Sequence, residues 1–256
     1  MKNWFQRRLY KRRQKYKSKS FRYTIYLFRI FTLILVLDIF YISYIWPDWP
    51  TYGRGSVKKT KFIENYESRL KTHPDLPLLQ WKPVPMNWIP IDMRNATIVA
   101  EDSRFYQHTG FDLEALKDAM EYNVEHMEFK YGASTISQQT IKNMFLSSRR
   151  NPLRKWHELI LTVGMELKLS KTRILEIYLN VAEFGKGIFG VEAAARYYYG
   201  ISANTLSAWQ AAELAASLPS PQKHNPKTKT RKFIKRSKKI YRYMQILSSQ
   251  TNGPKY

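Results

Sequence analysis

The 256-residue sequence contains no cysteine, and this absence excludes several classes of protein. Without thiols the chain has no disulfide framework, no thiolate zinc site, no iron–sulfur cluster and no cysteine nucleophile. Glycine and proline are also scarce, at 10 and 12 residues, whereas apolar residues make up 44% of the chain. This composition excludes a collagen-like, low-complexity or mainly disordered protein. We therefore expect a chain that folds around one sizeable core.

Acidic residues are missing from both ends of the sequence. Residues 1–22 contain 10 Lys and Arg and no acid, and residues 223–256 contain 11 and no acid. The residues between them carry 22 bases and all 20 acids, so the formal charge of +23 lies almost entirely in the two ends. A nucleic-acid enzyme is expected to carry its basic charge on the folded face, which argues against a nucleic-acid partner. Two basic ends favour anionic lipid surfaces.

One long hydrophobic run follows the basic start. Residues 21–46 read FRYTIYLFRIFTLILVLDIFYISYIW, in which Asp38 is the only acid. About 20 apolar residues are enough to cross a hydrocarbon layer. Because Pro47 follows and no small-residue cleavage site does, the run predicts an uncleaved transmembrane helix at 23–46 rather than a signal peptide. By the positive-inside rule, the preceding cations stay in the cytoplasm and the rest of the chain lies on the outer side.

The remainder of the chain is predicted to be mostly α-helical. Five prolines interrupt residues 52–92, so only a short helix at 60–71 is expected there. Between 93 and 217 the apolar residues recur three and four positions apart, which is the spacing of amphipathic helices. The fold class is therefore mostly α with one N-terminal transmembrane helix.

The segment AEDSRFYQHTGFD places two acids at the end of an apolar run. Glu101 and Asp102 follow Ile-Val-Ala and precede Arg104, Phe105 and His108. A carboxylate held in a poorly solvated pocket has a raised pKa and can act as a general base. The alternative is a solvated acid pair that forms a salt bridge with Arg104. No second histidine lies at metal-ligand spacing from His108, so the segment predicts no metal site.

The segment YGASTISQQTIKN predicts a helix start that carries polar side chains. Thr135 and Gln138 have the spacing of a capping box. Gln138, Gln139 and Lys142 place two amides and an ammonium group on adjoining parts of one helical face. Beside the free N–H groups of a helix start, such a face suits an anionic or sugar ligand. Ordinary solvent-facing Gln and Lys residues are the alternative.

The segment SSRRNPLRKWHELI gathers cations where a helix is expected to begin. The dipeptide Asn-Pro at 151–152 predicts an N-cap followed by the first helical residue. Arg154 and Lys155 occupy the first turn, where the helix dipole disfavours cations, and Arg150 lies just before it. This cluster predicts a polyanion site. Ion pairs with Glu158, one turn further along the helix, are the alternative.

These stretches, in this order and spacing, resemble the peptidoglycan glycosyltransferase family, the domain shared by monofunctional transglycosylases and class A penicillin-binding proteins. The resemblance covers residues 87–225 and is carried by EDSRFYQHTG, GASTISQQTIKN, RKWHE, RILEIYLN through AAARYYYG, and AAELAASLPSPQKHNP. No serine-x-x-lysine motif follows, so the resemblance is to the monofunctional form. It implies a lysozyme-like, two-lobed glycosyltransferase domain whose smaller lobe dips into the membrane.

The resemblance implies an enzyme that polymerises lipid II, a disaccharide-pentapeptide on undecaprenyl pyrophosphate. The product is a β-1,4-linked glycan, formed with inversion and release of undecaprenyl pyrophosphate. Glu101 matches the general base, and Glu158 matches a second glutamate that orients cations, helps to hold a metal or assists departure. Asp102 is expected to support local structure, while Arg104, Phe105 and His108 shape the acceptor side. The cations expected at the pyrophosphate are Lys142, Arg150, Arg154 and Lys155, and the residues expected to line the donor and acceptor clefts are Ser134, Gln138, Gln139 and Asn143.

Cofactors, partners and location follow from the same resemblance. No cofactor is required, because the pyrophosphate linkage already activates the donor sugar; a divalent cation, Mg or Mn, near the pyrophosphate is optional, and its ligands are unknown. The expected partners are lipid II, the growing lipid-linked glycan chain, membrane lipids and other cell-wall synthesis and division proteins. The expected location is the bacterial cytoplasmic membrane, with the catalytic domain in a periplasm or beneath a thick wall. The expected regions are a basic cytoplasmic segment (1–22), the transmembrane helix (23–46), a membrane-proximal linker (47–85), the glycosyltransferase domain (86–225) and a basic C-terminal tail (226–256).

Two other classes of function remain open. A lysozyme-like hydrolase or lytic transglycosylase would use a lone glutamate as a general acid on a finished glycan. A membrane-anchored scaffold without activity would explain the anchor and the basic ends, but would leave Glu101, Lys142 and Glu158 unexplained.

Overall fold

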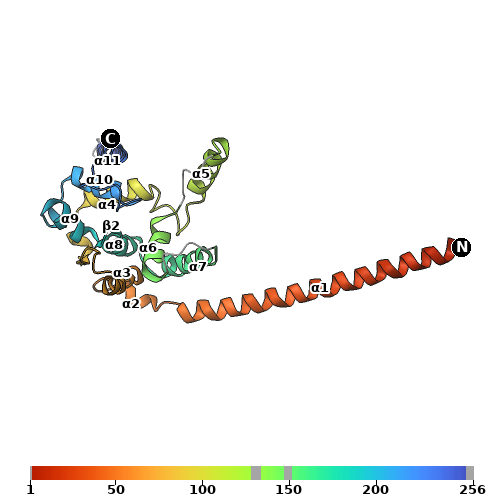
Figure 1. The fold of residues 1–256 in the computed structure, drawn as a ribbon. Coiled ribbons are helices and arrows are strands. Elements are labelled where there is room, and N and C mark those ends of the chain that lie inside the picture. The colour runs from red at the N-terminus through yellow and green to blue at the C-terminus, as the bar shows by residue number, and fades with distance from the viewer. Residues whose placement is uncertain (1, 128–133, 147–151, 252–256) are drawn as a thin grey trace. The chain divides into compact units, whose positions relative to one another are not determined.

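The computed structural model describes residues 2–127, 134–146 and 152–251. Within them most of the chain is helical, which confirms the predicted fold class (Figure 1). The chain divides into two compact units, Met1–Pro47 and Asp48–Tyr256.

The first unit is one long helix, α1 (Lys2–Ile45). Its part from Phe21 to Ile45 is long and apolar enough to cross a membrane, in agreement with the span predicted at 23–46. The basic residues that precede this part belong to the same helix. Pro47, which lacks an N–H group, follows the end of the helix.

The second unit consists of short helices and one small sheet. Several helices begin at a side chain that accepts a backbone N–H: Asp112, Thr135, Ser170 and Ser207. The pair Thr135 and Gln138 forms the predicted capping box. The elements in chain order are α2 (Trp49–Gly53), α3 (Lys61–Thr72), β1 (Gln80–Trp81), η1 (Met86–Trp88), α4 (Ile91–Glu101), α5 (Leu113–Glu125), α6 (Ile136–Phe145), α7 (Pro152–Lys168), α8 (Lys171–Val181), β2 (Glu183–Gly185), β3 (Ile188–Phe189), α9 (Val191–Tyr199), η2 (Ala203–Thr205), α10 (Ala208–Ser217) and α11 (Arg231–Thr251).

Two helix groups form the body of this unit. Helices α4, α10 and α11 pack on one another, and α6 packs against α7 and α8 (Figure 1). Helix α11 lies in the region expected as a basic tail, yet it has a buried side made by Phe233, Ser237, Ile240 and Met244. Their spacing of four, three and four residues places them along one face of the helix. The basic end of the chain therefore contains a helix that contributes to the core.

The sheet has the strand order β1-β3-β2, with β1 parallel and β2 antiparallel to β3. Asn180, near the end of α8, fixes the chain that follows β1. Its Nδ2 donates to the carbonyl of Val84 at 2.8 Å, and its Oδ1 accepts the N–H of Val84 at 2.7 Å. The indole N–H of Trp81 donates to the Asn180 carbonyl at 2.9 Å. Because both groups of the Asn180 amide are buried and paired, this contact holds the lead-in to α4 against α8.

Gly190, between β3 and α9, is a position where a side chain should not be tolerated. Its φ is +82°, and an added Cβ would lie 2.6 Å from the carbonyl oxygen of Asn180. Backbone strain and this clash together predict that Gly190→Ala lowers the free energy of unfolding by about 2–4 kcal/mol. Thermal unfolding of the detergent-solubilised chain should show a lower Tm. Gly200→Ala is the matched control, because its φ of +72° is similar but nothing lies within 4 Å of the added Cβ. Equal losses in both variants would remove the clash from the explanation.

Candidate active site

Glu101, the last residue of α4, lies with its carboxylate held between two other helices. The side chain is only 10% exposed. Gln139 of α6 donates from Nε2 to Oε2 at 2.9 Å, and Arg236 of α11 donates from Nη2 to Oε1 at 2.9 Å. The same Nη2 atom also donates to the carbonyl of Ala100 at 2.9 Å. Both oxygens of this carboxylate thus accept a hydrogen bond, and the solvated acid pair considered from the sequence is wrong for Glu101.

Burial is the dominant influence on the Glu101 carboxyl. It raises the pKa of Glu101, because a charged carboxylate loses its hydration there. Hydrogen bonding from Gln139 and the positive charges of Arg236 and Lys142 act in the opposite direction and favour the ionised form. The outcome is a poorly solvated carboxylate with a raised pKa and donors on both oxygens, which is the environment of a general base.

The buried phenol of Tyr178 on α8 contacts Gln139. Its hydroxyl donates to Oε1 of Gln139 at 3.2 Å, so the amide is oriented with its NH₂ group toward Glu101. Burial holds the pKa of Tyr178 well above its usual range, which keeps the hydroxyl protonated and able to donate. Tyr178 therefore holds Gln139 in place, and Gln139 in turn holds the carboxylate of Glu101.

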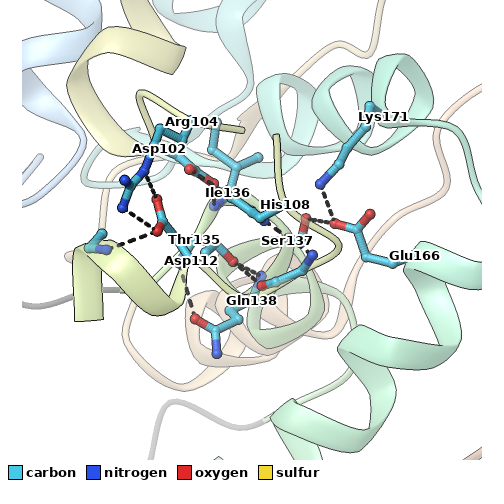
Figure 2. A network of polar contacts seen from close by, with 12 residues as sticks. Asp102, Arg104, His108, Asp112, Thr135, Ile136, Ser137, Gln138, Glu166 and Lys171 are labelled. Atoms are coloured by element: carbon cyan, nitrogen blue, oxygen red, sulfur yellow. Dashed lines mark hydrogen bonds and ion pairs between the residues drawn. The ribbon is translucent and has the colours of Figure 1, made fainter. Parts of the chain in front are cut away.

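Asp102 connects the loop after α4 to the start of α6 (Figure 2). Its Oδ1 lies 2.9 Å from Nε2 of His108, and its Oδ2 accepts the N–H of Ile136 at 3.0 Å. Thr135 donates from its hydroxyl to the carbonyl of Gly110 at 2.7 Å. These contacts support the structural role expected for Asp102, and they set the position of the helix that carries Gln139.

Arg104 does not pair with the acid pair at 101–102. Its guanidinium binds Asp112 at 2.6 Å and contacts Glu114. Phe105 is fully buried, and the ammonium group of Lys171 lies 4.5 Å from its ring centre. These residues brace the loop between α4 and α5, and the expectation that they shape the acceptor side stays a prediction.

Asp102, His108 and Asp112 are close enough to be considered as metal ligands, with ligand atoms within 4.8 Å of one another. The carboxylate oxygens of this cluster already accept hydrogen bonds, however. Asp102 accepts from His108 and from Ile136, while Asp112 accepts from Arg104 and from the N–H of Ala115. Within the described residues this cluster is thus a hydrogen-bond network, and nothing in it points to an ion.

A second buried glutamate lies among the cations of α7. Glu158 is 3% exposed; Arg154 binds its Oε2 at 3.2 Å, and Lys155 contacts its Oε1. The ion pairs considered from the sequence are therefore present. Since both oxygens are engaged, Glu158 is arranged to orient these two cations. The other roles expected for it, in holding a metal or assisting departure, stay predictions. Helix α7 begins at Pro152, as predicted.

Lys142 of α6 is a partly buried cation near both glutamates. Burial lowers the pKa of Lys142, Glu158 and Glu101 raise it, and Arg154 and Lys155 lower it. An ammonium group in this position is poorly hydrated and surrounded by charge of both signs. It would gain more from an arriving anion than an exposed lysine would.

Two cavities meet at Ser134. The polar cavity, of about 700 Å³, is lined by Glu101, Gln139 and residues of α10 and α11 together with the chain that joins these helices. The apolar cavity, of about 670 Å³, is lined mainly by Leu113, Leu116, Trp156, Leu159, Ile160 and Val163 of α5 and α7. Ser134 lines both, and Lys155, at 3.5 Å from the Ser134 hydroxyl, lines the apolar cavity. The arrangement suits a molecule with one polar and one apolar part.

The structure brings together most of the site residues expected from the sequence. Gln138 lines the apolar cavity and also completes the capping box, whereas Asn143 is buried in α6 and lines neither cavity. Arg150 lies outside the described residues. Two residues that contact the site were missed, Tyr178 and Arg236. The signal for Arg236 was the apolar spacing in its helix, which indicates a face packed against the domain.

Comparison with known proteins identifies the family of the chain. The transglycosylase family model matches residues 78–245. A biosynthetic peptidoglycan transglycosylase of Laribacter hongkongensis is 40% identical over 216 residues, which cover 84% of this chain and 94% of that protein. Proteins of the same name from Janthinobacterium and Aeromonas hydrophila are 42% identical over 213 residues and 46% identical over 168 residues, covering 83% and 66% of this chain and 90% and 71% of theirs. The match spans the helices that hold Glu101, Lys142, Glu158 and Arg236, and the chain belongs to the transglycosylase family.

Proposed function

We propose that this chain is a peptidoglycan glycosyltransferase that polymerises lipid II into β-1,4-linked glycan strands and releases undecaprenyl pyrophosphate. The observation that carries the proposal is the position of Glu101, a buried carboxylate in a polar cavity that adjoins an apolar one. The names of the relatives and the family membership support the reaction class.

In this mechanism Glu101 is the general base. It accepts the proton of the acceptor's 4-hydroxyl while that oxygen attacks the anomeric carbon of the donor sugar. The new C–O bond forms as the bond to the pyrophosphate oxygen breaks on the opposite face, so the configuration inverts. The donors Gln139 and Arg236 hold the carboxylate in place and favour its ionised form before reaction. General base catalysis of this kind contributes about 10²–10⁴-fold to a rate.

The leaving pyrophosphate gains negative charge as the glycosidic bond breaks. Lys142, Arg154 and Lys155 supply the positive charge that stabilises it, and Glu158 holds the latter two cations in position. Arg150 has the same proposed role. The mechanism uses no step through a divalent cation, and the optional Mg or Mn stays a prediction.

The two cavities match the two parts of the proposed substrate. The apolar cavity takes the lipid nearest the pyrophosphate, and the polar cavity takes the sugars. Leu113 of α5, which lines the apolar cavity, is 72% exposed, and Leu153 and Leu167 of α7 are 56% and 76% exposed. A surface of this kind buries favourably in the headgroup region of a bilayer.

The proposed location is the cytoplasmic membrane, with α1 as a single-pass anchor. By the positive-inside rule, the ten Lys and Arg of residues 1–22 support a cytoplasmic N-terminus, with the second unit on the outer side. A substrate carried in the same bilayer reaches the site without a nucleotide. Other cell-wall synthesis and division proteins are the proposed protein partners.

A lysozyme-like hydrolase is the second candidate, because burial raises the pKa of Glu101. Such an enzyme needs a protonated glutamate that donates to the glycosidic oxygen. Here both oxygens of Glu101 accept hydrogen bonds, one of them from a guanidinium group that disfavours protonation. The geometry favours a base.

The proposal is tested with detergent-solubilised full-length protein and labelled lipid II, with products resolved by length. We expect a ladder of lipid-linked polymer that lysozyme digests. Parallel reactions with Mg²⁺, with Mn²⁺ and with a chelator determine the metal requirement. Finished cell wall, offered separately, should release no soluble sugars. Soluble fragments from the wall together with no polymer from lipid II would assign the protein to the hydrolases.

A further inference from the structure

The polar cavity has a row of cations on the wall formed by α11. Lys232, Arg236 and Lys239 of α11 line it together with Glu101. They are four and three residues apart, so they form one stripe along the helix. The stripe runs beside the buried residues Phe233 and Ile240, which fix the orientation of α11 against α4 and α10.

Only the middle cation of this stripe has an acidic partner in the cavity. Arg236 binds Glu101, and among the described residues that line the cavity Glu101 is the only acid. Among the described residues, Lys232 and Lys239 have no carboxylate within salt-bridge distance. The lining therefore carries two positive charges in excess, close to the proposed base.

We propose that Lys232 and Lys239 bind carboxylate groups on the peptide of the substrate and give the enzyme a preference for acidic over amidated peptides. The inference rests on the proposed function, because it concerns the polar part of the same substrate. The ligand is an anion, and the substrate offers two kinds, pyrophosphate and peptide carboxylate.

The positions of the two cavities distinguish pyrophosphate from peptide carboxylate as the anion that the lysines bind. The pyrophosphate is joined to the lipid, so it lies near the apolar cavity, where Lys155 provides a cation. The sugars follow in the polar cavity beside Glu101, and the peptide is attached to the sugars. Lys232 and Lys239 lie on α11, in the cavity that the sugars occupy and not in the one that takes the lipid. We therefore assign the peptide, which is attached to the sugars, to these two lysines.

The test uses two forms of lipid II, one with free peptide carboxylates and one in which they are primary amides. The double variant Lys232→Gln/Lys239→Gln is compared with the wild type. The control is Lys235→Gln/Lys238→Gln, which removes two cations of the same helix that do not line the cavity. KM and kcat are measured for both substrates. Dissociation constants are measured in a Glu101→Gln background, where binding is observed without polymerisation.

For the acidic substrate we expect the cavity variant to raise KM and Kd about 3- to 30-fold, the range of one or two exposed charge pairs. For the amidated substrate the cavity variant should leave KM and Kd unchanged. The control variant should leave KM and Kd unchanged for both substrates. Equal losses on both substrates would mean that the lysines bind pyrophosphate or serve the fold, and this overturns the proposal. No loss on the acidic substrate also overturns it. Failure of the wild type to polymerise lipid II rejects the proposed function, while the binding comparison still decides this inference.

Discussion

Glu101→Gln is expected to reduce the rate of glycan polymerisation about 10²–10⁴-fold while the protein stays folded. Gln keeps the shape of the side chain and its acceptor oxygen, but it cannot take a proton from the acceptor hydroxyl. In the wild type the base must be ionised, so activity should fall as the pH drops through the pKa of Glu101. Because burial raises that pKa, the fall should begin at a higher pH than for an exposed glutamate. The measurement is the initial rate of lipid II consumption across pH.

Glu183→Gln is the matched control. Burial also raises the pKa of Glu183, whose side chain accepts a hydrogen bond from Gln222 at 2.8 Å, but it lines neither cavity. Its rate and pH profile should stay within about twofold of the wild type, a difference of less than 0.5 kcal/mol in the barrier. Polymer formed by Glu101→Gln at the wild-type rate would remove Glu101 from the reaction.

Arg236→Met should have the next largest effect, about 10- to 100-fold at neutral pH. The estimate corresponds to the loss of one hydrogen bond between charged groups, about 1.5–3 kcal/mol. Without the guanidinium the pKa of Glu101 rises further, since one of the charges that favour its ionised form is gone. The acid side of the pH–rate profile should therefore move to higher pH, with part of the lost activity recovered there.

The pH profile separates positioning of the base from a general loss of structure. If Arg236 served only the packing of α11, its replacement would lower the rate by the same factor at every pH. Arg236→Lys retains a cation and should recover part of the activity, whereas Lys235→Met, one residue earlier in the helix, should have no effect. Arg236→Met with an unchanged profile would contradict a link between this arginine and the ionisation of Glu101.

The features that could be predicted from the sequence depend on residues close together in the chain. The capping box at Thr135, the start of α7 at Pro152 and the apolar run before Pro47 are each defined within a few residues or one helix. The same holds for the pairing of Glu158 with cations of its own helix. Local spacing determines such contacts, because helix geometry alone decides which side chains meet.

The contacts that could not be predicted join distant parts of the chain. Gln139 binds Glu101 from 38 residues away, and Arg236 binds it from 135 residues away. Residues so far apart in the chain show no regular spacing from which a single sequence could predict their contact. The basic composition of residues 226–256 predicted a tail, whereas the structure has a packed helix there. Six of the eleven cations of residues 223–256 lie between Lys232 and Arg242, in the helix whose apolar side chains pack against the domain. Here the tertiary packing of α11 brings Arg236 to Glu101, although composition alone assigns this arginine to a basic tail.

The separation between Glu101 and Arg236 also has a consequence for biogenesis. A chain leaves the ribosome from its N-terminus, so α4 is synthesised well before α11. Until α11 arrives, the carboxylate of Glu101 lacks its guanidinium partner and the polar cavity lacks one of its walls. The site is therefore completed only when α11, the last described helix, has been synthesised, and a nascent chain that ends before α11 carries an unfinished site.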